Sequence, residues 1–188
     1  MPLKVTLATV NKANVGQLRV LNTTILPVRY SDAFYKDVLK DEKLIRYAQH
    51  NDATIGAVAC REEKSSEDGG PSLYVMTLGV LAPYRRLKAG HALLTYVLDL
   101  CRDEKALAHI ERIHLHVQVS NDDAIAFYAK YGFAVVGDVV ENYYVRLEGD
   151  DGRARKLQLD LGALRAVWAA AAAGAEAAAA GAAAGDGN

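Results

Sequence analysis

Apolar residues recur along this chain with the spacings of strands and helices, most clearly between residues 73 and 101. Residues 73–81 are apolar on both faces, which predicts a central strand covered on two sides. After a turn that contains Pro83, apolar residues three or four positions apart follow over residues 93–101. This spacing predicts a helix of about three to four turns that begins at Gly90 or His91.

The chain up to residue 147 alternates between strand and helix patterns. Period-two apolar residues predict strands near residues 3–7 and over residues 44–50, 54–61, 113–119, 133–137 and 143–147. Asn51 and Asp52 favour a tight hairpin turn between the second and third of these. Helices are predicted over residues 15–25, after Ser31, and after the capping-box-like residues 120–123. We therefore expect an α/β domain with one mixed, twisted sheet of about seven strands and about four helices.

Composition changes after Glu148, and this change predicts the domain organisation. Residues 1–148 have the patterns of one folded domain, whereas residues 149–156 are polar and charged. Residues 157–168 have the composition of a short helix, and Trp168 is a candidate to dock on the domain. Residues 169–185 are almost entirely alanine and glycine, which predicts a low-complexity tail of marginal helicity. We expect residues 149–188 to form a polar linker and this tail.

Charge and cysteine content limit the classes of protein to which the chain can belong. Its 188 residues carry a formal net charge of −1, which gives no support for a nucleic-acid partner held by bulk electrostatics. Cys60 and Cys101 lie within apolar segments, as expected for buried thiols in a reducing compartment. No signal peptide is recognised, nor any membrane-length apolar run outside the alanine-rich tail. We expect a cytoplasmic protein with no direct nucleic-acid or membrane contact.

The turn after the central strand combines three features of an anion site. Arg85, Arg86 and Lys88 supply positive charge, and the following helix begins with backbone N–H groups that have no partner within the helix. The helix dipole also favours negative charge at this end. The turn is therefore predicted to bind a phosphate or pyrophosphate, and the alternative is a basic surface turn without a ligand.

Residues 85–90, read as RRLKAG, resemble the acyl-CoA-binding signature R/Q-x-x-G-x-G/A of the GNAT N-acetyltransferases, with Lys88 in place of the first glycine. The flanking sequences LYVMTLGVLAPYRRL, HLHVQVSNDDAIAFYAKYGF and NYYVRL resemble members of that family that acetylate protein N-termini. The resemblance implies a GNAT fold with acetyl-CoA as cosubstrate and no metal. Lysine at a position that favours glycine could strain or block the turn, or could add a contact to the phosphates.

The same resemblance implies where acetyl-CoA binds. The positions are the backbone of the central strand, the basic turn with the start of its helix, and two residues of the later helix segment. They are Leu78, Gly79, Val80, Arg85, Arg86, Leu87, Lys88, Ala89, Gly90, His91, Asn121 and Tyr128.

Acetyl transfer to an amine requires a neutral amine, a donor to the thioester oxygen and an acid for the departing thiolate. An α-amino group has a pKa of about 7.7–8.0, against about 10.4 for lysine, so a mild base suffices for an N-terminus. Tyr74 and His116 lie on strands that can pair, and the resemblance implies that they deprotonate the amine through an ordered water. Tyr128 is implied as the acid near the sulfur. From the residues alone, His116 could be a satisfied strand histidine, or could pair with His114 on a metal that lacks a third ligand.

A second set of residues is implied to bind the acceptor. Residues 25–30 form a loop that is more apolar than exposure favours, and it is either a lid over the core or the wall of a substrate pocket. Leu26 stands where the family commonly has an aromatic residue, which predicts a wider pocket. The mainly apolar set suits a peptide whose first residue is methionine. It consists of Leu26, Pro27, Val28, Tyr30, Tyr74, Met76, Tyr143 and Tyr144.

These residues predict an N-terminal α-amino acetyltransferase that acts on nascent polypeptide N-termini beginning with Met and then a hydrophobic or other permitted residue. The resemblance also implies a NatA-type acetyltransferase complex as a partner. Two alternatives remain open at this point. One is a catalytically weak or inactive subunit of such a complex, and the other is an acetyltransferase for internal lysines or small amines.

Overall fold

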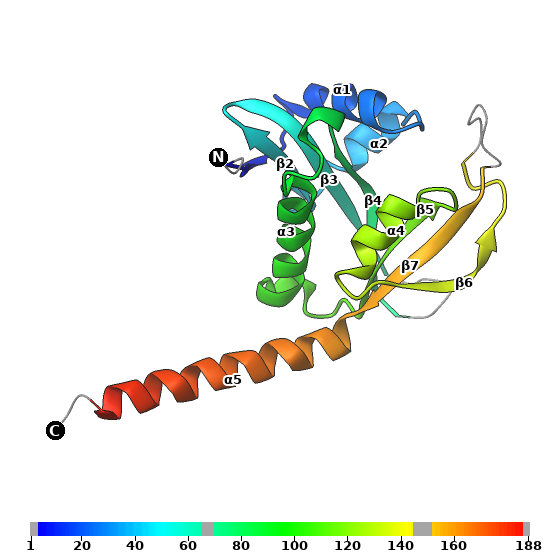
Figure 1. Ribbon diagram of the computed structural model, residues 1–188. Coiled ribbons are helices and arrows are strands. Elements are labelled where there is room, and N and C mark those ends of the chain that lie inside the picture. Colours follow the sequence, from blue (N-terminus) through cyan, green and yellow to red (C-terminus); the bar gives the residue numbers. More distant parts are fainter. Residues whose placement is uncertain (1–3, 65–69, 145–151, 186–188) are drawn as a thin grey trace.

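The computed structural model describes residues 4–64, 70–144 and 152–185, and it describes side chains up to residue 175. One seven-stranded sheet with the order β1-β2-β3-β4-β5-β7-β6 forms its centre (Figure 1). All neighbouring strands are antiparallel except β4 and β5, so the sheet is mixed, as predicted. The strands are β1 Thr6–Thr9, β2 Ile45–His50, β3 Ala53–Glu63, β4 Ser72–Val80, β5 Arg112–Gln118, β6 Ala134–Val140 and β7 Ala154–Asp160.

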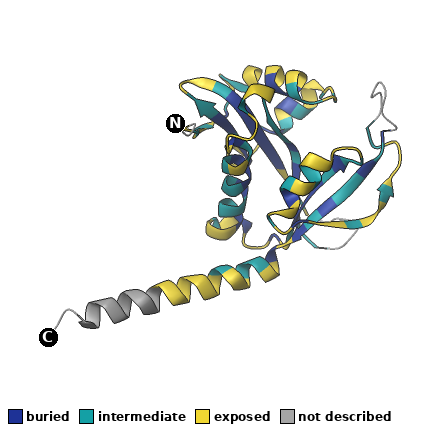
Figure 2. Cartoon of the chain, viewed as in Figure 1, coloured by how far each residue is buried: buried dark blue, intermediate teal, exposed yellow. Residues whose placement is uncertain are grey.

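Helices cover both faces of the sheet. Leu18 of α1 packs with Tyr47 and Ala57 against one face, while Leu93 of α3 packs with Val75 against the other. Buried residues therefore concentrate in the strands between these helices (Figure 2). The helices are α1 Val15–Ile25, α2 Asp32–Asp37, α3 Ala89–Asp103, α4 Asp122–Ala129 and α5 Leu161–Gly185.

Local sequence accounts for two turns in this architecture. Asn51 and Asp52 have positive φ angles of 46° and 65°, and they close the β2–β3 hairpin as predicted. At the start of α4, however, the helix cap is Asn121, whose Oδ1 accepts a hydrogen bond of 3.1 Å from the backbone N–H of Ala124. The capping-box prediction that placed Ser120 in this role was wrong by one residue, because either side chain satisfies the same preference.

The central strands separate halfway along their length. β4 and β5 pair from Ser72 with Arg112 to Tyr74 with His114, and their ladder ends there although both strands continue. The pairing of β4 with β3 also shifts at this point, because Cys60 pairs with Val75 and Ala59 with Thr77. Met76 is thus the extra residue of a bulge. Loss of the ladder beyond Tyr74 leaves β4 backbone groups facing a gap between the strands.

The predicted end of the domain at residue 148 was wrong. Residues 154–160, expected as linker and as the start of a short helix, form strand β7 between β5 and β6. Leu157 and Leu159 are buried, and pairing with β5 satisfies the backbone of a strand that reads as polar at its start. The strand predicted over residues 143–147 is not present at Tyr143 and Tyr144, and its remaining residues lie outside the described ranges.

Helix α5 begins on the domain and then projects from it (Figure 1). The Arg165 guanidinium donates hydrogen bonds to the carbonyl oxygens of Ile110 (2.7 Å) and Leu107 (3.1 Å). Trp168 packs on the core, with the Arg102 guanidinium 5.9 Å from its ring centroid, as expected for a docked tryptophan. None of the helices described in the structure has both the length and the apolarity needed to cross a membrane.

Candidate active site

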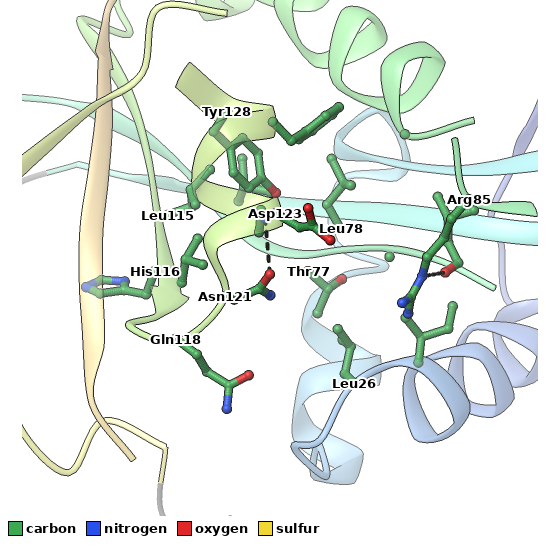
Figure 3. Close-up of a pocket in the computed structure, with 18 of the residues that line it drawn as sticks. Leu26, Thr77, Leu78, Arg85, Leu115, His116, Gln118, Asn121, Asp123 and Tyr128 are labelled. Atoms are coloured by element: carbon green, nitrogen blue, oxygen red, sulfur yellow. Dashed lines mark hydrogen bonds between the residues drawn. The ribbon is translucent and has the colours of Figure 1, made fainter. Parts of the chain in front are cut away.

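A cleft of about 1040 Å³ opens where β4 and β5 separate. Its walls are the loop after α1, the second halves of β4 and β5, the basic turn with the N-terminal end of α3, α4, and Tyr144. Thr77 and Leu78 from β4 and Tyr128 from α4 converge on it (Figure 3). The loop of residues 26–30 thus lines a cleft, which favours the pocket-wall interpretation over a lid on the core.

Most residues predicted to bind a cofactor lie along this cleft. Leu87 and Ala89 do not line it: Leu87 is 42% exposed at the surface, and Ala89, the first residue of α3, is buried in the core. The others are brought together: Leu78, Gly79, Val80, Arg85, Arg86, Lys88, Gly90, His91, Asn121 and Tyr128.

The predicted acceptor residues divide into two groups. Six of them line the cleft: Leu26, Pro27, Val28, Tyr30, Met76 and Tyr144. Tyr74 and Tyr143 do not line it, but their hydroxyl groups share a hydrogen bond of 2.6 Å beside it. Tyr74 also meets the cleft-lining residue His116 directly, edge to face at 5.9 Å between ring centroids, and Tyr143 contacts both His116 and Tyr144.

The basic turn has the backbone shape that glycine would favour. Lys88 is the residue that precedes α3, and its φ of 69° and ψ of 5° lie in the left-handed region. Arg86 also has a positive φ, of 62°. Such conformations cost a non-glycine residue about 1 kcal/mol or more, which the surrounding fold must offset. Lys88 is exposed on the cleft wall, so the turn keeps its shape and gains a positive charge.

One basic side chain of this turn is held by the protein itself, whereas other groups at the turn remain able to bind a ligand. Arg85 Nε donates to the carbonyl oxygen of Val80 at 3.1 Å, which ties the turn to the end of β4. Gly90 and His91, in the first turn of α3, line the cleft, so the positive end of the helix dipole lies at its wall. A Cβ atom built on Gly90 would lie 3.6 Å from Phe127, an ordinary contact that leaves room for alanine. The arrangement can hold a phosphate-bearing ligand.

An aromatic cluster closes the other end of the cleft. The His116 ring stacks on Tyr143 with a centroid distance of 4.2 Å and an interplanar angle of 19°. Tyr144 donates its hydroxyl hydrogen to the backbone oxygen of His116 at 3.0 Å. His116 Nδ1 is buried and has no hydrogen-bond partner among the residues described. An ordered water could satisfy this nitrogen and connect it to a ligand.

Burial sets the protonation of the cluster. It lowers the pKa of His116 to about 4, with further lowering by His114 and Lys156, so the imidazole is neutral at pH 7. Burial and the hydrogen bond between Tyr74 and Tyr143 raise the pKa of Tyr74 well above its ordinary value. Burial likewise raises the pKa of Tyr128. Tyr74 and Tyr128 therefore keep their protons, and His116 is the member of this set able to accept one.

Sequence reasoning missed several residues of the cleft. Thr77 is the most informative, because its Oγ1 is buried without a described partner next to the Met76 bulge. The bulge has no sequence signal, so the direction of Thr77 could not be predicted. The missed lining residues are Val75, Thr77, Leu115, Val117, Gln118, Asp123, Ala124, Ala126, Phe127, Lys130 and Tyr131.

Comparison with known proteins identifies the family to which a chain with this cleft belongs. The model of the acetyltransferase (GNAT) family matches residues 17–133. N-alpha-acetyltransferase 50 of Danio rerio is 45% identical over 148 residues, which cover 79% of this chain and 84% of that protein. The probable N-acetyltransferase san of Drosophila melanogaster is 41% identical over 77% of this chain and 76% of its own length.

A solved structure agrees with these relatives. Arabidopsis thaliana Naa50, in complex with the bisubstrate analogue CoA-Ac-MVNAL, superposes with a TM-score of 0.72 at 42% identity. The match covers 83% of this chain and 98% of the Arabidopsis chain. Fold, cleft and sequence agree in one assignment: this chain belongs to the GNAT acetyltransferase family.

Proposed function

We propose that this chain is an acetyl-CoA-dependent N-terminal acetyltransferase for proteins that begin with Met followed by a hydrophobic or other permitted residue. The observation that carries the proposal is the single cleft that joins two unlike ends. One end has the basic turn and the α3 N-terminus, and the other is apolar and aromatic with a neutral His116 beside it. Relatives named N-alpha-acetyltransferase 50 support the same activity.

Acetyl-CoA would be held by groups with matching chemistry. The diphosphate fits the turn of Arg86 and Lys88 and the first N–H groups of α3. Backbone N–H groups of β4 beyond Tyr74 have lost the β5 ladder, and they are candidates to donate to the thioester oxygen as it becomes negative. Tyr128 carries a proton that it can donate to the thiolate of CoA.

His116 would take the proton of the amine through a water on Nδ1, with Tyr74 and Tyr143 ordering that water. An α-amino group with a pKa of about 7.7–8.0 is already partly neutral near pH 7, so a weak base is sufficient. The neutral nitrogen then attacks the thioester carbonyl carbon, a C–N bond forms and the C–S bond breaks. The second proton that the nitrogen loses as the amide forms replaces, through solvent, the proton that Tyr128 gives to the thiolate. His116 is thus the base that accepts a proton from the amine, and Tyr128 is the acid that donates one to the thiolate.

The acceptor end suits an unbranched apolar first residue. Leu26, Pro27 and Val28 supply an apolar wall, and the hydroxyls of Tyr30 and Tyr144 provide polar contacts. The peptide part of the analogue in the Arabidopsis Naa50 complex, MVNAL, also begins with Met. A methionine side chain could occupy this wall while its α-amino group lies toward His116.

We further propose a NatE-type role beside the ribosome in the cytoplasm, with a NatA-type complex as the protein partner. The resemblance to N-alpha-acetyltransferase 50 over most of the chain supports this placement. An inactive subunit is the less favoured alternative, because the turn at Lys88 retains the left-handed shape of the signature.

The acceptor is tested by comparing a Met-Leu peptide with an N-terminally blocked peptide that carries one lysine. We expect kcat/KM to favour the Met-Leu peptide by about 100-fold or more, since the pKa values of the two amines differ by about 2.5 units. Product mass and initial rates give the measurement. Preference for the lysine peptide would replace the proposal by a lysine acetyltransferase, and binding of acetyl-CoA without turnover of either peptide would favour the inactive subunit.

A further inference from the structure

Two adjacent glutamates of β3 each pair with a histidine, and the two histidines differ in their exposure to solvent. Glu62 Oε2 lies 3.3 Å from Nε2 of His109, whose side chain is 52% exposed. Glu63 Oε2 lies 3.4 Å from Nε2 of His114, whose side chain is only 6% exposed. Adjacent strand residues point to opposite faces, so the two pairs lie on different sides of the sheet. Only the Glu63 pair includes a buried histidine, which lies beside the aromatic cluster, while the Glu63 side chain itself is 25% exposed.

His114 forms a platform for Tyr74. The two residues are directly opposite each other in the last step of the β4–β5 ladder. Their rings stack with a centroid distance of 5.0 Å and an interplanar angle of 18°. Arg61, paired with Glu63 at 2.6 Å, places its guanidinium 5.6 Å from the Tyr74 ring centroid. Glu63 therefore contacts both groups that adjoin this ring, the Arg61 guanidinium and the His114 imidazole.

The stack continues into the candidate active site. The hydroxyl of Tyr74 bonds to that of Tyr143, and the Tyr143 ring stacks on His116. Two ring stacks, His114 on Tyr74 and Tyr143 on His116, are thus joined by the hydroxyl contact of 2.6 Å. They also meet edge to face, because the His116 ring centroid lies 5.9 Å from that of Tyr74 and 6.4 Å from that of His114. Displacement of His114 would change where the Tyr74 hydroxyl lies relative to His116.

We propose that Glu63 and His114 are a positioning pair for acetyl transfer: the carboxylate fixes the imidazole on which Tyr74 stacks, and so holds the Tyr74 hydroxyl beside His116. The inference rests on the proposed function for its kinetic consequence. Its structural part, the immobilisation of Tyr74 by Glu63 through His114, does not depend on which amine is acetylated. Neither residue lines the cleft.

Burial explains why the pair needs a carboxylate. Loss of the Glu63 carboxylate would remove a charged contact of a buried imidazole and so weaken the hold on its orientation, because burial makes each polar contact of such a ring count. Glutamine at position 63 keeps the shape of glutamate but removes its charge. Aspartate keeps the charge on a shorter side chain. These two substitutions separate the charge from the size of the residue.

The kinetic test compares Glu63→Gln with Glu62→Gln, which removes the same charge from the exposed pair. We expect Glu63→Gln to lower kcat for the Met-Leu peptide by about 10-fold, as for other residues that orient a catalytic group, with the KM for acetyl-CoA unchanged. Glu63→Asp should recover part of the loss, and Glu62→Gln should match the wild type. Equal kcat in all four proteins, or a parallel rise in the KM for acetyl-CoA with Glu63→Gln, would overturn the pair's role.

A second readout is independent of turnover. The ring resonances of Tyr74, assigned in NMR spectra by their absence in Tyr74→Phe, should shift in Glu63→Gln and in His114→Ala but much less in His114→Phe, which keeps a stacking ring. Unchanged Tyr74 resonances in folded His114→Ala would refute the platform. If the wild-type protein fails to acetylate the Met-Leu peptide, the proposed function fails, while this measurement still decides the positioning of Tyr74.

Discussion

Substitution of Tyr74 by Phe together with His116 by Ala is expected to lower kcat for a Met-Leu peptide by about 100-fold or more, the usual range for loss of a positioned acid–base group. His116 is neutral, and its Nδ1 has no described partner, so its removal eliminates the base of the proposed reaction. Phe at position 74 retains the ring that stacks on His114 but removes the hydroxyl bound to Tyr143.

A matched double variant distinguishes catalysis from general damage. Tyr96→Phe with His109→Ala removes the same two chemical groups outside the cleft, where the Tyr96 hydroxyl bonds to the Lys43 carbonyl oxygen and His109 is half exposed. This control should keep kcat within a few-fold of the wild type. Unchanged turnover in the Tyr74→Phe, His116→Ala protein would remove both residues from the mechanism.

The pH profile of the wild type follows from the same assignment. Because the pKa of His116 is lowered to about 4, its neutral form dominates throughout the range from pH 6 to pH 9. The rate at low peptide concentration should therefore rise with pH through about 7.7–8.0, the pKa of the α-amino group of the substrate. The rise at this pH belongs to the acceptor rather than to His116.

Reversal of charge at Arg86 and Lys88, in the variant Arg86→Glu with Lys88→Glu, is expected to weaken acetyl-CoA binding by about 100-fold. A charge-assisted hydrogen bond contributes about 1.5–3 kcal/mol, and two such contacts are replaced by repulsion. Both residues line the cleft beside the N-terminus of α3. Glutamate meets the same left-handed backbone as the residues it replaces, so the change is mainly electrostatic.

Calorimetric titration of acetyl-CoA measures this effect. Lys12→Glu with Lys36→Glu changes the net charge equally at exposed positions outside the cleft, and it should leave the affinity nearly unchanged. Lys88→Gly restores the residue of the signature and should bind within about 10-fold of the wild type, since it loses one contact of this kind. Equal affinity of the reversed and wild-type proteins would exclude the turn as the phosphate site.

The alternation of apolar residues was sufficient to predict most of the sheet and the place of the basic turn. The hairpin at Asn51 and Asp52 and the central strand followed from local preferences, and the structure confirms both. Strand β7 could not be predicted in the same way. Its second and third residues, Arg155 and Lys156, are charged and point to opposite faces, so no apolar alternation marks its start. Only pairing with β5 and β6 makes Leu157 and Leu159 core residues.

The candidate site, like the fold, has some features that could be predicted from the sequence and others that could not. Resemblance identified the turn, His116 and Tyr128, which all reach the cleft. The positions of Tyr74 and Thr77 depend on the Met76 bulge and on where the β4–β5 ladder ends, and neither feature is encoded in a local pattern. The strain accepted at Lys88 likewise became visible only as a φ angle, because a lysine in a turn does not reveal its backbone conformation.

The central claim is that one cleft binds CoA and a Met-initiated peptide together with their reacting atoms adjacent. Its most direct test is calorimetric titration with a bisubstrate analogue in which CoA is joined through an acetyl group to the α-amino group of a Met-Leu peptide. We predict one-to-one binding that is about 10-fold or more tighter than that of acetyl-CoA, because the second ligand is tethered. Tighter binding of an analogue joined through a lysine side chain, or no gain over acetyl-CoA, would contradict the account.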